Sequence, residues 1–212
     1  KELFLDLLNE SKLDYLIHFM KNTMFLPENE LDAGSVVLVP LREEHADDLA
    51  DAASDGKLWE LWFTSVPRPD AIDTYISLAL QQQKDGLSQP FVVVEKLSGK
   101  VIGSTRFCNL DYANKRVEIG YTWYAKSHQR SSVNTECKLA LLNHAFEVLD
   151  VIAVEFRTHW HNLESRKAIA RLGAKQDGVL RQHQRLPDGS FRDTVVFSII
   201  NSEWAAVKNN LV

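Results

Sequence analysis

The sequence predicts an α/β domain with one mixed, mostly antiparallel central sheet flanked by helices. Three apolar segments, 91–95, 101–110 and 115–124, follow one another with short turns between them, which favours an antiparallel meander. A long apolar helix at 133–149 then leads to a further strand at 151–158, and this strand–helix–strand unit indicates one parallel pair. Both patterns in one chain predict a mixed sheet with helices on its two faces.

The other elements are predicted from local patterns. Asp70 can cap a helix, Gly173 stands where a helix commonly ends, and 187–190 is Pro-Asp-Gly-Ser, a hairpin turn signal. In chain order we expect a strand at 36–41, helices at 43–54 and 70–83, a helix at 163–172, strands at 175–186 and 191–200, and a short helix at 204–211.

The composition is that of a globular protein. The 212 residues are 45% hydrophobic and 25% charged, which suits one domain with a substantial core. The formal net charge of −5 argues against a nucleic-acid partner, which needs a clustered basic face. The same acidic balance mildly favours cationic ligands through electrostatic steering.

Cysteine use and hydropathy predict a cytoplasmic protein without a membrane partner. Cys108 and Cys137 fit neither a disulfide framework nor a zinc site, but they fit a reducing compartment. No stretch approaches the roughly 18–20 uninterrupted apolar residues that span a bilayer. His159 and His161 flank Trp160 without a cysteine or carboxylate at ligand spacing, so no metal is expected there.

The chain is expected to divide into an N-terminal helical extension and connector, 1–34, and one domain, 35–212. Apolar residues within 3–20 recur at helical spacing but are interrupted by charges, which indicates an amphipathic helix and not a signal peptide. Such a helix needs a surface to cover, either its own domain or a second copy across a two-fold axis. The second arrangement would make the protein a homodimer.

A short polar turn opens the long helix. It follows a strand and brings hydroxyl, amide and guanidinium groups to the first helical turn. Free backbone N–H groups and the positive end of the helix dipole make such a helix start an anion site. The predicted site comprises Gln129, Arg130, Ser131, Ser132, Val133, Asn134 and Thr135.

A second motif follows one strand later. Asn162 and Ser165 form Asn-x-x-Ser at the start of helix 163–172, and 117–121 is Val-Glu-Ile-Gly-Tyr. These motifs, in this order, resemble the GNAT acyltransferases over about 36–200, in particular the branch with the ribosomal-protein N-terminal (alanine/serine) acetyltransferases. GNAT enzymes transfer an acetyl group from acetyl-coenzyme A to an amine. The resemblance implies a GNAT-like sheet, splayed between the strands on either side of the cofactor helix.

The resemblance also implies how acetyl-coenzyme A would bind. Its pyrophosphate would lie on the polar turn, where Gln129 matches the family motif and Ser132 and Asn134 replace two glycines. The splayed strand would pair its free backbone groups with the pantetheine arm, as an added strand would. By resemblance these groups belong to Thr122, Trp123 and Tyr124, whose aromatic side chains can still face the core.

Catalytic roles follow from the same resemblance. Ser165 matches the serine assigned to protonate the leaving thiolate, and Asn162, also a plausible N-cap, would hydrogen-bond the cofactor. The branch has a basic glutamate at the position of Gln184, and an amide cannot accept a proton in the useful pH range. Three replacements stay open: Glu118, His183, or water beside a carboxylate such as Asp193.

The sequence therefore predicts an acetyl-coenzyme A-dependent N-acetyltransferase that acts by direct transfer to a primary amine, either a protein N-terminus or a small amine. Neither cysteine stands where a covalent nucleophile would be needed. The alternative is a non-catalytic acyl-coenzyme A binder or sensor on the same fold. This alternative stays open because Gln184 stands at the position of the basic glutamate. A nucleotide-binding protein is disfavoured, since neither a Walker lysine nor Gly-x-Gly-x-x-Gly occurs.

Overall fold

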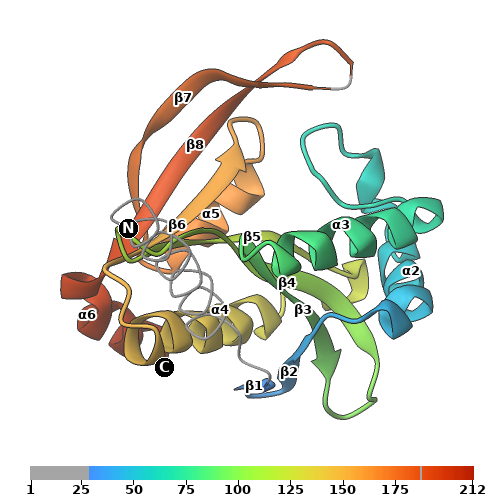
Figure 1. Ribbon diagram of the computed structural model, residues 1–212, viewed down its shortest axis with the longest axis horizontal. Helices are drawn as coiled ribbons and strands as arrows, with labels where there is room; N and C mark the ends of the chain where they lie inside the picture. Colours follow the sequence, from blue (N-terminus) through green and yellow to red (C-terminus); the bar gives the residue numbers. More distant parts are fainter. Residues whose placement is uncertain (1–28, 187) are drawn as a thin grey trace, which may run out of the picture.

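The computed structural model describes residues 29–186 and 188–212, which form one eight-stranded sheet with helices on both faces (Figure 1). The strand order is β1-β2-β3-β4-β5-β6-β8-β7, and every neighbouring pair is antiparallel except β5 and β6. The predicted mixed, mostly antiparallel sheet is thereby confirmed. The amphipathic helix expected near the N-terminus lies outside the described residues.

The elements are as follows. The strands are β1 (Leu31–Ala33), β2 (Val36–Pro40), β3 (Ser88–Glu95), β4 (Val101–Asp111), β5 (Arg116–Tyr124), β6 (Ala153–His159), β7 (Lys175–Arg185) and β8 (Phe191–Ile200). The helices are α2 (Ala46–Ser54), α3 (Ile72–Lys84), α4 (Val133–Asn143), α5 (Leu163–Arg171) and α6 (Asn201–Leu211). Short 3₁₀ turns occupy Glu43–His45, Leu58–Glu60, Pro69–Ala71 and Lys126–His128.

Several local predictions need correction. Residues 31–33, expected in the connector, form strand β1 and pair with β2. The long helix changes to a π turn at His144–Val148, so only its first part is α-helical. Asp70 does not cap α3, because its carboxylate accepts a hydrogen bond from Arg68 Nε at 3.0 Å within a 3₁₀ turn.

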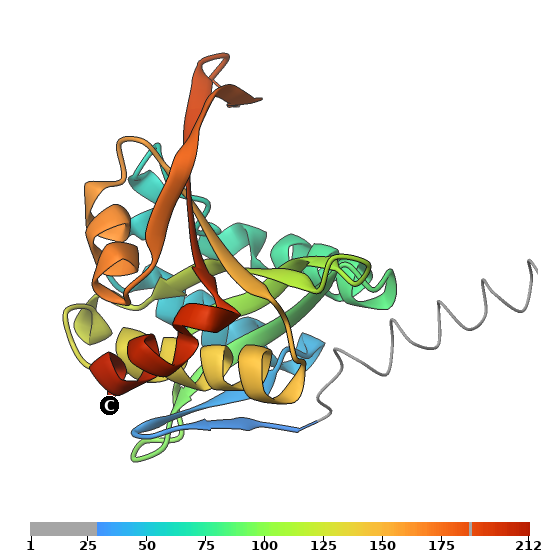
Figure 2. The ribbon, with the colours of Figure 1, turned by 90° about the vertical axis from the view of Figure 1, so that its left-hand side faces the viewer.

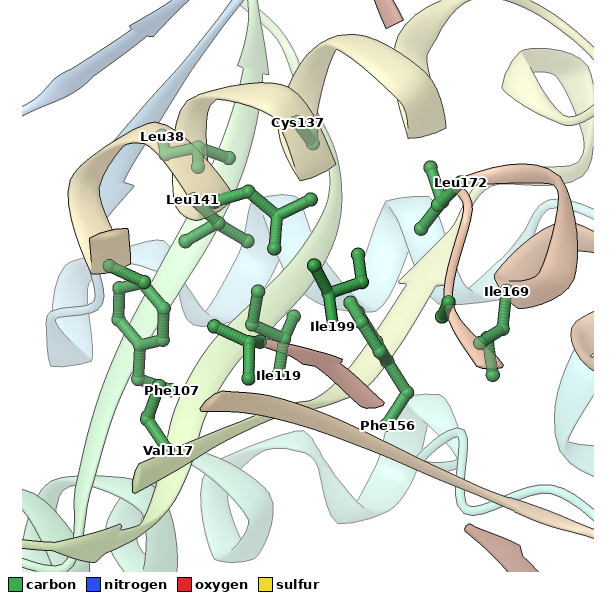
Figure 3. Close-up of a cluster of buried hydrophobic side chains, with 14 of the residues drawn as sticks. Leu38, Phe107, Val117, Ile119, Cys137, Leu141, Phe156, Ile169, Leu172 and Ile199 are labelled. Atoms are coloured by element: carbon green, nitrogen blue, oxygen red, sulfur yellow. The ribbon is translucent and has the colours of Figure 1, made fainter. Parts of the chain in front are cut away.

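Two apolar clusters hold the layers together, one on each face of the sheet. The larger joins the sheet to α4, α5 and α6, and Figure 3 shows Leu141 of α4 near Phe107 and Ile119 of the sheet. The smaller joins α2 and α3 to the opposite face and includes Val92 and Trp123. Because both faces are covered, the central strands have long buried runs where an open sheet would alternate.

A β-bulge interrupts β5 in the middle of the sheet. Ser104 pairs with Trp123 and Arg106 pairs with Gly120, so one residue of β4 faces two residues of β5. Tyr121, inside the bulge, has a φ of 51°, in the left-handed region. The extra residue reverses the alternation of side chains along the strand. Odd-numbered residues of β5 therefore face α4 before the bulge, and even-numbered residues face it after the bulge.

The sheet opens between β5 and β6. These strands pair in parallel only from Arg116 opposite Ala153 to Glu118 opposite Glu155, and both then continue without each other. The splay that the family resemblance implies is therefore present. Beyond it, β8 and β7 extend from the body as a two-stranded arm (Figures 1 and 2).

Neither a membrane span nor a metal centre occurs among residues 29–186 and 188–212. No helix there combines the length and apolar character that a bilayer crossing requires. Likewise, no group of three or more histidine, cysteine, aspartate or glutamate side chains in this part of the chain could hold a metal ion.

The close approach of β4 to β5 yields a stability prediction. A Cβ on Gly103 would lie 2.2 Å from the carbonyl oxygen of Trp123, so Gly103→Ala must push the strands apart. We expect its free energy of unfolding to fall by about 1–3 kcal/mol in urea titrations. Gly178→Ala on β7, where a Cβ meets nothing within 4 Å, is the matched control. Equal stability of Gly103→Ala and the parent protein would contradict this packing.

Candidate active site

A cavity of about 790 Å³ opens where β5 and β6 part. Its walls come from the end of β5, the start of α4, β6, the start of α5, and the segment between α2 and α3. In Figure 1 that last segment faces β6 and the arm from the other side of the molecule. The volume lies within the range of about 300–1,000 Å³ that is usual for ligand pockets.

The polar turn before α4 forms one end of this cavity. The Gln129 side chain donates from Nε2 to the carbonyl oxygen of Tyr124 at 3.1 Å, which fixes the turn to the end of β5. Arg130 has a φ of 62°, so the chain turns sharply before the helix. Of the seven predicted anion-site residues, four line the cavity, namely Gln129, Arg130, Ser131 and Asn134, whereas Ser132, Val133 and Thr135 do not.

Ser131 and Glu136 shape the first turn of α4. The Ser131 hydroxyl donates to the carbonyl oxygen of His128 at 2.6 Å and accepts from the N–H of Val133 at 3.4 Å. The Glu136 carboxylate accepts from the backbone N–H and hydroxyl of Ser35, at 2.9 and 2.5 Å. This acidic group is therefore held by the β1–β2 turn and is not among the cavity walls.

The end of β5 forms another part of the cavity wall. Thr122, Trp123 and Tyr124 all border the cavity. The side chains of Trp123 and Tyr124 are buried in the two apolar clusters, on opposite faces of the sheet. Their aromatic rings are therefore core residues, and their backbone is the part of them that a ligand could meet along the splayed edge.

Lys138 is a cavity residue that the sequence analysis missed. It is buried on α4, and its Nζ lies 2.5 Å from the Thr122 hydroxyl and 3.5 Å from the Thr105 hydroxyl. Burial lowers the pKa of this lysine to about 8, because its charged form loses hydration. Its spacing of four residues from Asn134 places both on one face of the helix, which is the signal that could have found it.

The Asn162–Ser165 pair caps α5 at the other side of the opening. Asn162 Oδ1 accepts a hydrogen bond from the backbone N–H of Ser165 at 3.1 Å, which confirms the N-cap expected from the sequence. Both residues line the cavity. Because the cap uses the backbone of Ser165, the serine hydroxyl is not consumed by it.

Glu118 stands directly behind the cavity wall. It is only 8% exposed, accepts from Asn109 Nδ2 at 2.7 Å and lies 3.4 Å from Arg157 Nε. Burial is the main cause that raises the pKa of this carboxyl, against the opposing effects of Asn109 and Arg157. Gly120 lines the cavity and lies beside Glu118, since a Cβ on Gly120 would lie 3.2 Å from Glu118 Oε1.

The other candidate bases lie on the arm, away from the cavity walls. Gln184 and His183 are in the exposed part of β7, where the register with β8 shifts and Gln182 has a φ of 49°. Asp193 is held by Arg181 Nε at 2.5 Å and by the N–H of Gln182 at 2.7 Å. The structure thus brings Ser165 and Glu118 towards the opening but does not bring Gln184 there.

Three further polar residues face the opening on the α2–α3 side of the sheet. Arg157 and His159 of β6 and Arg192 of β8 line the cavity. Their signal in the sequence is the alternation Glu155, Arg157, His159 within an apolar strand, which puts the polar positions on one face. The sequence analysis considered His159 only as a metal ligand, which it did not expect, and did not single out either arginine.

Both cysteines are buried and free. Burial raises the pKa of Cys137 to about 11 and also raises that of Cys108, so neither thiol ionises readily. Neither lines the cavity. No described residue therefore offers a reactive thiolate at the site.

Sequence comparison places this site in a known family. Residues 35–175 match the family described as "Acetyltransferase (GNAT) domain". The chain is 28% identical over 167 residues to the "Uncharacterized N-acetyltransferase p20" of Bacillus licheniformis, which covers 76% of this chain and 90% of that protein. It is 27% identical over 149 residues to the "Putative ribosomal N-acetyltransferase YdaF" of Bacillus subtilis, which covers 69% of this chain and 80% of that protein.

Solved structures agree with this placement. A GCN5-related N-acetyltransferase from Brucella melitensis superposes with a TM-score of 0.77 at 30% identity, covering 87% of this chain and 84% of the other. RimJ of Mycobacterium smegmatis, solved with a coenzyme A disulfide, shares the fold with a TM-score of 0.72 at 21% identity, covering 86% and 91%. The family match, the named relatives and the splayed sheet lead to one conclusion: this chain belongs to the GNAT acetyltransferase family and is an N-acetyltransferase.

Proposed function

We propose that the protein transfers the acetyl group of acetyl-coenzyme A directly to the primary amine of a protein N-terminus or a small molecule. One observation carries the proposal. The cavity at the parting of β5 and β6 joins the start of α4, the free edge of β5 and the Asn162–Ser165 cap, and the sheet behind it holds a buried carboxylate, Glu118.

The residues at the α4 end fit the phosphates of a coenzyme. A helix start offers unpaired backbone N–H groups and a positive dipole, and Arg130 adds a guanidinium beside them. The edge of β5 after Glu118 offers backbone groups to an extended arm, because β6 no longer pairs with it. Asn162 and Ser165 face the same opening from α5. When bound, the coenzyme would supply the thioester that the amine attacks.

The proposed chemistry assigns two proton transfers to this chain. As the amine nitrogen bonds to the acetyl carbon and the carbon–sulfur bond breaks, Glu118 takes the proton that the amine loses. Ser165 donates its hydroxyl proton to the leaving thiolate and regains a proton from water, while Glu118 releases its proton to water. A raised pKa suits Glu118 as a base near neutral pH, since an ordinary carboxylate is too weak a base there. Gln184 has no part in this scheme, because it lies on the arm.

The relatives support an amine acceptor of this kind. One relative, YdaF of Bacillus subtilis, bears the name "Putative ribosomal N-acetyltransferase". A protein N-terminus is therefore one acceptor class to test, with amino acids, polyamines and aminoglycosides as the small-molecule classes.

Turnover tests the proposal as a whole. Purified protein with acetyl-coenzyme A should release coenzyme A thiol when N-terminal peptides or small amines are added, as monitored with a thiol reagent. The buried protein thiols should add little background. The alternative, an acyl-coenzyme A sensor, predicts binding by calorimetry but no release with any amine.

The role of Ser165 can be read from kinetics. We expect Ser165→Ala to lower kcat by up to about 10²-fold, the lower end of the range for a lost proton-transfer group, with a smaller change in KM. The Asn162 cap should persist, since it uses the backbone. Ser165→Thr keeps a hydroxyl and should recover part of the rate. A change in KM alone would mean that the serine only positions the cofactor.

The role of Glu118 can be read from pH dependence. If it is the base, Glu118→Gln should lower kcat/KM by about 10²–10⁴-fold. Burial raises the pKa of Glu118, so the parent enzyme should lose activity as the pH falls through a range above the pKa of an ordinary glutamate. The variant should lack this acidic limb of the pH–rate profile. Glu155→Gln, on the neighbouring strand, should keep the limb but move it to lower pH, because the charge of Glu155 helps to raise the pKa of Glu118. An unchanged limb in Glu118→Gln would assign the proton to another group or to water.

A further inference from the structure

The α2–α3 side of the cavity carries more positive charge than its own side chains balance. On this face of β5, β6 and β8 stand three guanidinium groups and two carboxylates, namely Arg116, Arg157, Arg192, Glu118 and Glu155. Arg116 and Arg157 both bind Glu155, with shortest distances of 2.7 and 3.0 Å. Arg157 also approaches Glu118, whose Oε2 accepts a hydrogen bond from an amide. Both carboxylates are thereby engaged.

Arg192 is the remaining guanidinium. It is half-buried on β8 and lines the cavity, and its Nε is buried without a hydrogen-bond partner in the described chain. Glu118 attracts its charge, while Arg157 repels it. A buried donor without a partner costs free energy, and a charged donor costs more. The arrangement therefore favours a ligand that brings an anionic oxygen to Arg192.

His159 offers a second donor at the same place. Only 3% of it is exposed, and its Nδ1 accepts a hydrogen bond from the N–H of His161 at 3.0 Å. This bond puts the proton of the neutral ring on Nε2, which is buried without a partner among the described residues. Burial, followed by the charge of Arg192, lowers the pKa of His159 and keeps the ring neutral. It lines the same cavity.

Aromatic rings pack against His159, the neutral donor of this pair. The Trp62 ring meets the His159 ring edge-on, with centroids 4.9 Å apart, and Phe63 packs against Trp62 and lines the cavity. Apolar cover limits the water that could satisfy the donors. A charge-assisted hydrogen bond in such a place contributes more than one in bulk water.

We propose that this end of the cavity binds the carboxylate of an acidic amine acceptor, with Arg192 as the charged donor and His159 Nε2–H as the neutral donor. The inference rests on the proposed transfer reaction and narrows its acceptors to primary amines with a carboxylate near the amino group. Two sources share this chemistry: the α-carboxylate of a free amino acid, and an acidic side chain early in a protein N-terminus. The positive charge at this end of the cavity thus favours an acidic acceptor, whereas the net charge of −5 by itself would favour a cationic one.

Matched acceptor pairs test the proposal and separate its two sources. Alanine against alaninamide reports on an α-carboxylate, and amidated peptides beginning Ser-Asp against Ser-Asn report on an early acidic side chain. In at least one pair the acidic member should have a kcat/KM about tenfold higher or more, mostly through KM. Equal rates in both pairs, or a preference for the neutral members, would overturn the carboxylate site. Failure of every amine to release coenzyme A would instead overturn the transferase itself.

Variants of Arg192 then test whether this residue causes the preference for the acidic acceptor. Arg192→Gln should bring the acidic-to-neutral ratio of kcat/KM close to one, and Arg192→Lys should keep part of it. Arg185→Gln removes the same charge from the exposed end of β7 and should leave the ratio unchanged. A purely structural role of Arg192 would slow both members of a pair alike, and an unchanged ratio in either folded Arg192 variant would overturn the proposal. If Arg192→Gln fails to fold, Arg192→Lys still tests the proposal.

Discussion

The parting of β5 from β6 is the constraint on which the site depends. The two strands pair in parallel only as far as Glu118 and Glu155, and each then continues without the other. Backbone groups along a strand must find partners, so the unpaired edge of β5 is available to a ligand. Because these strands are parallel, the chain between them must form a crossover connection. Helix α4 forms this connection and begins beside the unpaired edge. The cavity, its open backbone edge and the helix start beside it therefore all lie where the pairing between the two strands stops.

The β-bulge decides what each face of the opened sheet presents. One extra residue at Tyr121 lets Ile119 and Tyr124 both reach the cluster under α4, while Trp123 packs on the α2–α3 side. The α4 side carries Thr122 and the lysine that contacts it. The α2–α3 side carries the carboxylates, arginines and His159. A cofactor and an acceptor could therefore meet across the sheet from sides with different chemistry.

Burial tunes the ionisable groups around the opening. Burial raises the pKa of Glu118 and lowers those of Lys138 and His159, so each is displaced towards its neutral form. Perturbed groups gathered around one cavity are typical of active sites. Arg192 is the exception, since a guanidinium keeps its charge even when burial lowers its pKa. This contrast between adjustable groups and one fixed charge underlies the proposed acceptor preference.

The fold class, the helix cap at Asn162 and the polar start of α4 could be predicted from the sequence, because apolar strand segments, caps and turns are local patterns. The sequence could not place Gln184, because the strand pattern does not reveal that β7 is an edge strand whose only partner in the described chain is β8. Nor could it show that Lys138 and Arg192 are buried beside the cavity, because both look like ordinary surface residues in the sequence. Local periodicity fixes which face a side chain takes, whereas only the tertiary structure decides what that face meets, since strands distant in sequence supply the neighbours.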